Sequence, residues 1–186
     1  MHIRLILPLA AAIALSACGS KEQAKEGPVS PDDAAEQMSN LETPEAGQYK
    51  ATVEVIEFDI PGLPDAQKEQ MKQVFYGSLA QGHTYCLTKE EAANGAKEMA
   101  KKLAEGDCTF NDFKAGGNSL YADMSCKDKN GIQGSVKLAG TMSKDGSDMT
   151  MTMNQKVPNV PGEGTVNMKM HMVSQRVGDC PAGAAG

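Results

Sequence analysis

Apolar and polar side chains alternate along most of the second half of the chain. This period of two is typical of β-strands that bury one face. The apolar positions of four such runs are Leu120, Ala122, Met124 and Cys126, then Ile132, Gly134, Val136, Leu138, Gly140 and Met142, then Met149, Met151 and Met153, then Val166, Met168, Met170 and Met172. The pattern predicts successive strands that share one apolar face.

An earlier strand shows the same alternation with one interruption. Its first apolar positions are odd-numbered, from Tyr49 to Val55, and its last are even-numbered, from Ile56 to Ile60. A change of parity within one strand predicts a β-bulge near Val55, because one extra residue returns the later side chains to the buried face.

Two helices are expected between these strands. Thr88 and Glu91 have the spacing of a capping box, which begins a helix, and Gly106 follows where a left-handed C-terminal residue belongs. An earlier helix is expected from about Asp65 to Gln81, and a brief one is compatible with residues 32–41. The apolar faces of the two longer helices are Met71, Val74, Phe75 and Leu79, and Ala92, Ala96, Met99, Ala100 and Leu103.

Turn lengths must keep the apolar sets on one side of the sheet, because a slip of one residue moves every side chain to the other face. A two-residue type I′ turn at Asp145-Gly146 satisfies this condition. It pairs Met142 with Met149. The last hairpin can pair Met151 with Met170 by the same parity.

The two preceding hairpins fit the same condition with longer loops. A three-residue loop over 129–131 and a five-residue loop over 115–119 both keep apolar side chains together. The resulting pairs are Met124 with Val136, Phe110 with Met124, and Cys108 with Cys126.

Cysteine spacing agrees with this register. Cys86, Cys108, Cys126 and Cys180 are an even set without a CxxC motif, which disfavours a zinc ribbon or a thioredoxin-like site. Pairing Cys108 with Cys126 leaves a second disulfide between Cys86 and Cys180. The predicted fold is α+β: a curled antiparallel β-meander of about six or seven strands, with two helices packed on one face, disulfide-stapled.

The beginning of the chain has the layout of an export signal. A short region with Arg4 precedes an apolar stretch, which ends in Leu15-Ser16-Ala17-Cys18. This ending resembles the lipobox of bacterial lipoproteins, whose cysteine becomes the acylated N-terminus. The alternative is an ordinary secretory signal with an incidental cysteine.

The expected organisation follows from this signal. Residues 1–17 are a cleaved lipoprotein signal peptide, and 18–46 comprise the lipidated Cys18 and a flexible polar tether. Residues 47–180 form a single globular domain, and 181–186 are a disordered tail. Because Gly19 rather than Asp follows Cys18, we expect an outer-membrane anchor facing the periplasm, reached through the lipoprotein export and sorting machinery.

Charge limits the partners. Lys and Arg number 18 against 24 Asp and Glu, a net charge of −6. Nucleic-acid-binding proteins present a basic face, so no nucleic-acid partner is expected. The membrane contact is expected to come from the acyl chains on Cys18.

Several short motifs together point to one family. They include Gly47-Gln48-Tyr49, Cys86-Leu87-Thr88 and the triplets Gly106-Asp107-Cys108 and Gly178-Asp179-Cys180. From about residue 46 to 180 the chain resembles the domain-of-unknown-function family "thirty-six seventeen", small envelope proteins of Gram-negative bacteria. That family usually has Trp where this chain has Tyr49. The resemblance implies a periplasm-facing domain and supplies no catalytic residues.

Methionines on neighbouring strands form the candidate site. They are Met142, Met149, Met151, Met153, Met168, Met170 and Met172. Flexible thioether side chains suit an adaptable apolar groove, which predicts an apolar ligand such as an acyl chain. The alternatives are a fully packed core behind a surface that binds an envelope protein, and, more distantly, copper(I) held by thioethers.

Other chemistry finds little support. The parity of His171 places it on the face opposite the methionines, and His83 is isolated. The chain contains no GxSxG, HExxH, P-loop or GxGxxG motif. We therefore expect no enzyme activity, no cofactor and no resident metal.

Overall fold

The computed structural model describes residues 28–105, 107–127, 133–157 and 164–183. Within these ranges the chain forms one sheet of seven antiparallel strands and three helices. The elements are α1 (Pro31–Met38), β1 (Gly47–Asp59), α2 (Asp65–Ala80), β2 (His83–Leu87), α3 (Lys89–Glu105), β3 (Cys108–Gly116), β4 (Ser119–Lys127), β5 (Gln133–Ser143), β6 (Gly146–Lys156) and β7 (Thr165–Gly178).

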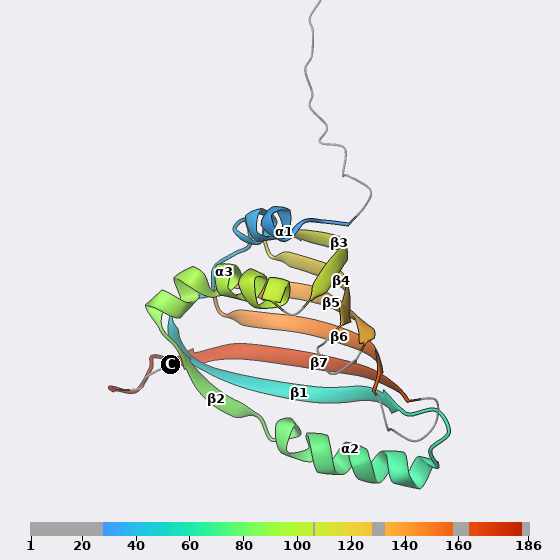
Figure 1. Ribbon diagram of the computed structural model, residues 1–186. Helices are drawn as coiled ribbons and strands as arrows, with labels where there is room; N and C mark the ends of the chain where they lie inside the picture. The colour runs from blue at the N-terminus through green and yellow to red at the C-terminus, as the bar shows by residue number, and fades with distance from the viewer. Residues whose placement is uncertain (1–27, 106, 128–132, 158–163, 184–186) are drawn as a thin grey trace, which may run out of the picture.

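The sheet has the order β2-β1-β7-β6-β5-β4-β3. Strands β3 to β7 form a meander, and β1 joins it through β7. The sheet curves, and α1 and α3 lie on its inner side near β3, whereas α2 lies by β1 at the other end (Figure 1). The α+β class is confirmed among the described residues. The expectation that the two longer helices pack together on one face is not confirmed, because α3 lies near β3 and α2 lies by β1.

The predicted pairing of apolar side chains is confirmed in most of the meander. Met151 lies opposite Met170, Met124 opposite both Val136 and Phe110, and β1 shifts register between Val55 and Glu57. Parity limited the choice here, because a register shifted by an odd number of residues would move the apolar sets to opposite faces.

Two predicted turns were wrong in detail. The β5–β6 turn is Lys144-Asp145, so Ser143 lies opposite Gly146 and Met149 opposite Gly140. A Cβ on Gly146 would collide with the carbonyl oxygen of Ser174, so this glycine permits close approach to β7 and does not form the turn.

The β3–β4 connection is also tighter than predicted. Gly116 lies opposite Ser119, which leaves a two-residue turn with Gly117 at φ 59°. The five-residue loop was predicted in order to place Phe110 opposite Met124. The shorter turn still gives this pair, because a register shift between Phe110 and Asp112 adds one residue to β3. The proposed three-residue loop at 129–131 and Gly106 lie outside the described residues.

The beginning of α3 follows its sequence signal. The Thr88 backbone N–H donates to the Glu91 carboxylate at 2.9 Å, and the Glu91 N–H donates to the Thr88 hydroxyl at 3.2 Å, which completes the capping box. These bonds hold the pKa of Glu91 below its usual value. Ser30 caps α1, with Pro31 in its first turn.

The core lies under α1. Ala34 and Met38 are fully buried against Phe110, Phe113 and neighbouring strand residues. The Val29 N–H also donates to the Phe110 carbonyl at 2.9 Å. The segment 28–46, expected within a flexible tether, thus includes a helix that belongs to the packed domain.

Both predicted disulfides are present. The Cα atoms of Cys108 and Cys126 are 4.1 Å apart across β3 and β4, and those of Cys86 and Cys180 are 5.5 Å apart. The second disulfide ties the end of β2 to the residues that follow β7. It therefore joins segments that are distant in sequence.

Candidate functional site

The predicted methionines lie together on the inner side of the sheet. Strands β6 and β7 pair in a register that forms three cross-strand methionine pairs: Met149 with Met172, Met151 with Met170, and Met153 with Met168. Met142 extends the set on β5. We call these seven residues the methionine face.

Aliphatic side chains continue this face on both flanking strands. On β5, Leu138 lies opposite Met151 and Val136 opposite Met153. On β1, Val53 lies opposite Met172 and Val55 opposite Met170. The apolar row therefore crosses four neighbouring strands without a charged side chain at these positions.

Burial differs along the methionine face. Met149, Met168 and Met170 are buried, whereas the other four are only half-buried. Met149 belongs to the core under α1, and Met142 and Met172 pack against that core. The half-buried Met151 and Met153 lie in the middle of β6.

Tyr76 of α2 covers the other end of the face. Its hydroxyl lies 2.7 Å from the sulfur of Met168, and its ring meets that of Phe58 edge-on at 5.8 Å between centroids. Burial raises the pKa of the Tyr76 phenol, so this group stays protonated at neutral pH. The methionine face is thus bounded by α1 and its core at one end and by Tyr76 at the other.

The opposite face of the same strands is polar. His171 lies opposite Thr150, and its Nε2 is 2.7 Å from the Asp148 carboxylate. The expectation that His171 faces away from the methionines is confirmed. Among the described residues, His, Cys, Asp and Glu form no group of three or more that could hold a metal ion.

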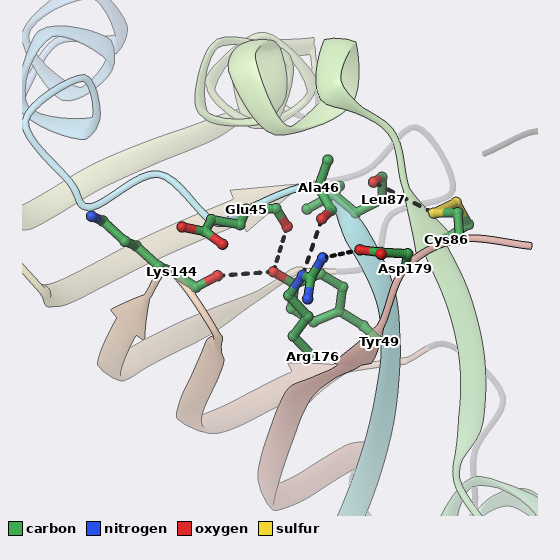
Figure 2. A network of polar contacts seen from close by, with 9 residues as sticks. Glu45, Ala46, Tyr49, Cys86, Leu87, Lys144, Arg176 and Asp179 are labelled. Carbon is green, nitrogen blue, oxygen red and sulfur yellow. Dashed lines mark hydrogen bonds and ion pairs between the residues drawn. A yellow bond between two sulfur atoms is a disulfide. The ribbon is translucent and has the colours of Figure 1, made fainter.

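A polar network closes one end of the sheet (Figure 2). The Tyr49 hydroxyl lies 2.7 Å from the Glu45 carbonyl and 3.0 Å from the Lys144 carbonyl. Arg176 donates from Nε to the Ala46 carbonyl at 3.1 Å and pairs with Asp179 at 2.6 Å.

This network explains the motifs Gly47-Gln48-Tyr49 and Gly178-Asp179-Cys180. A Cβ on Gly47 would lie 2.5 Å from Arg176 Nε and 2.6 Å from the Gly178 carbonyl oxygen, so the glycine permits this approach. Tyr49 is buried and stacks on Tyr85 at 5.6 Å between centroids, and burial is the main cause that raises its pKa. Sequence reasoning missed Arg176, whose role depends on contacts with residue 46.

These motif residues serve the fold. Their polar groups bond one another, and the Cys86–Cys180 disulfide lies beside them (Figure 2). The network joins the entry to β1, the β5–β6 turn and the end of β7. It holds the sheet that presents the methionine face.

The membrane-anchor prediction concerns residues that the structure does not describe, since Cys18 lies outside them. Within the described ranges, no helix combines the length and apolar character needed to cross a membrane.

Comparison with known proteins gives a family match. The model of the protein family described as "Protein of unknown function (DUF3617)" matches residues 44–180, which is more than half of the chain. No curated protein and no solved structure matches. The resemblance that the motifs indicated is therefore confirmed.

Proposed function

Because the chain belongs to the DUF3617 family, whose description assigns no function, we propose from the geometry a non-enzymatic binding module of the cell envelope. Its methionine face holds an apolar ligand such as a single acyl chain. The observation that carries this proposal is the half-buried state of Met151 and Met153 between two covered ends.

The contrast in burial within one sheet supports this proposal. Under α1, Phe110 and Met38 are each 1% exposed, as expected for a closed core. Met151 and Met153 belong to the same apolar face yet keep part of their surface accessible. Ligand sites are typically apolar with few polar groups, and the Tyr76 hydroxyl at the border suits the polar end of an amphiphile.

Methionine is suited to such a face. Its unbranched side chain adapts to irregular partners, so adjacent thioethers can follow a flexible chain without a fixed shape. In this proposal α2 and α3 flank the methionine face and together limit access to it. Met99 of α3 packs against the core, whereas Val74, predicted on the apolar face of α2, is 71% exposed.

The cell envelope is proposed as the location. The two disulfides suit an oxidising compartment. The lipobox at Cys18 supports acylation and an outer-membrane anchor that faces the periplasm, and the acidic sequence supports attachment through the anchor alone.

Palmitate binding tests the proposed function. The chain without its anchor is first loaded with the fluorescent probe N-phenyl-1-naphthylamine. We expect added palmitate to displace the probe from the chain and so to lower its emission. Met153→Gln should weaken palmitate binding about tenfold, or about 1.4 kcal/mol, because it places an amide against the ligand. Thr152→Gln is the matched control, since Thr152 is exposed on the opposite face of β6.

Combined replacement of Met151 and Met170 by Leu separates the chemistries. Leucine preserves apolar volume but removes the thioether. Palmitate binding should persist in this variant, whereas copper(I) binding through thioethers would be lost. Equal palmitate binding by wild type, Met153→Gln and Thr152→Gln would refute the methionine face as the site.

A further inference from the structure

One edge of the sheet is only half covered. Strand β2 pairs with β1 from Gly47 to Ala51 and then ends. Within the described residues, positions 52–55 and 57–59 of β1 pair with β7 on one side, and positions 52–59 pair with no strand on the other. Such an edge has backbone N–H and C=O groups available to a further strand.

Helix α2 lies along this edge and forms a groove with it. Its groove-lining residues are spaced as one helical stripe: Glu69, Lys72, Gln73, Tyr76 and Gly77. Against this stripe lie residues 52–55 of β1 and two side chains of β7, around a hollow of about 620 Å³. Figure 1 shows α2 beside the β1–β2 end of the sheet.

The groove continues along the strand. A second hollow of about 340 Å³ follows residues 56–59 of β1 and shares Glu69 and Lys72 with the first. Together the two hollows accompany the whole unpaired part of the strand. An extended peptide of about eight residues, at roughly 3.3 Å per residue, matches this length.

Side chains from both faces of β1 border the groove because the strand is at the edge. Val53 and Val55 offer apolar surface from one face, and Ile56 is 51% exposed. Thr52 and Glu54 come from the other face, as does Val173 of β7. Alternating contacts of this kind suit the alternating side chains of an added strand.

The charge of the groove selects the partner. Its carboxylates outnumber its lysines, and Lys68 is already engaged by Asp59 at 2.6 Å and Asp65 at 3.5 Å. His171 is likewise engaged by Asp148 at 2.7 Å. The groove carboxylates are Glu54, Glu57, Asp59, Asp65 and Glu69, and the lysines are Lys68 and Lys72. An acidic groove of this composition favours a basic segment.

We propose that the groove between β1 and α2 binds an extended, basic peptide segment of a partner protein, which adds to β1 as an eighth strand. Backbone hydrogen bonds to residues 52–59 provide the pairing, and the carboxylates provide the charge preference. The groove contains none of the seven methionines, although it shares Val53, Val55 and Tyr76 with the border of the methionine face.

Gly77 offers a way to fill the groove without disturbing the fold. A Cβ built on Gly77 meets no atom within 4 Å, and replacing a helical glycine improves helix propensity. Gly77→Leu should therefore fold and occupy the groove. Gly95→Leu is the matched control, because Gly95 is also exposed within a helix, α3, and has the same free space.

The probes are two labelled peptides as long as residues 52–59, one alternating Val and Lys and the other alternating Val and Glu. Fluorescence anisotropy should detect binding of the Val-Lys peptide alone, weakening as salt rises. We expect Gly77→Leu to weaken it at least tenfold and Gly95→Leu to leave it unchanged. Hydrogen exchange of bound wild type should show new protection at residues 52–59.

Three outcomes would overturn the proposal. They are absence of Val-Lys binding to the wild-type chain, equal binding by Gly77→Leu, and binding without protection at residues 52–59. Palmitate binding, measured in parallel, should be the same in Gly77→Leu and wild type. If the wild-type chain binds palmitate but not the Val-Lys peptide, and Gly77→Leu loses palmitate binding, the groove is a lipid site and the peptide proposal fails.

Discussion

At the scale of single residues, the two stacked tyrosines show how position decides a side chain's contribution. The Tyr49 hydroxyl is buried between the Glu45 and Lys144 carbonyls, so it links the entry of β1 to the β5–β6 turn. The Tyr85 hydroxyl, by contrast, meets Ser174 in an exposed contact at 2.8 Å. A tyrosine hydroxyl therefore contributes more to stability at position 49 than at position 85.

Replacing each tyrosine by phenylalanine tests this difference. We expect Tyr49→Phe to lower the free energy of unfolding by about 1 kcal/mol, because part-buried carbonyls lose their donor. Tyr85→Phe should cost clearly less, since water replaces its exposed partner. Urea unfolding measured by circular dichroism compares the two variants. Equal losses of unfolding free energy would mean that the Tyr49 hydrogen bonds stabilise the fold no more than the exposed contact of Tyr85.

At the scale of elements, parity predicted which strands meet but not how the chain turns between them. Alternation combined with assumed loop lengths led to Cys108 opposite Cys126 and Met151 opposite Met170, as the structure has them. The Lys144-Asp145 turn escaped prediction because the conformation at Gly146 depends on Ser174, a contact distant in sequence. The burial of α1 escaped prediction because it depends on β3, although a brief helix over residues 32–41 was compatible with the sequence.

The two disulfides are expected to stabilise these elements unequally. Cys86 and Cys180 are separated by 94 residues, and Cys108 and Cys126 by 18. On the chain-entropy estimate, replacing the first pair by alanine costs about 5 kcal/mol of unfolding free energy and replacing the second about 3 kcal/mol.

Thermal unfolding of the two double-alanine variants provides the comparison. Each variant keeps one disulfide, so each serves as the control for the other. A larger loss of unfolding free energy from the Cys108–Cys126 replacement would contradict the prediction. It would show that local strand pairing contributes more to stability than closure of the longer loop.

At the scale of the whole molecule, the curved sheet divides into three parts. A closed core lies under α1, the half-buried methionines lie across β6 and β7, and the unpaired edge of β1 lies beside α2. The sequence pattern predicted the methionine face, since within each strand its residues share one parity. It could not predict the groove, because which strand forms an edge and where α2 lies are both set by tertiary contacts.

Native mass spectrometry of residues 19–186, exported through a signal without a lipobox, tests the central claim most directly. We predict a population heavier than the fully disulfide-bonded chain by one fatty acid or lipid, increased by added palmitate and diminished in Met153→Gln. A bare chain that acquires no adduct even with added palmitate would contradict ligand binding on the methionine face.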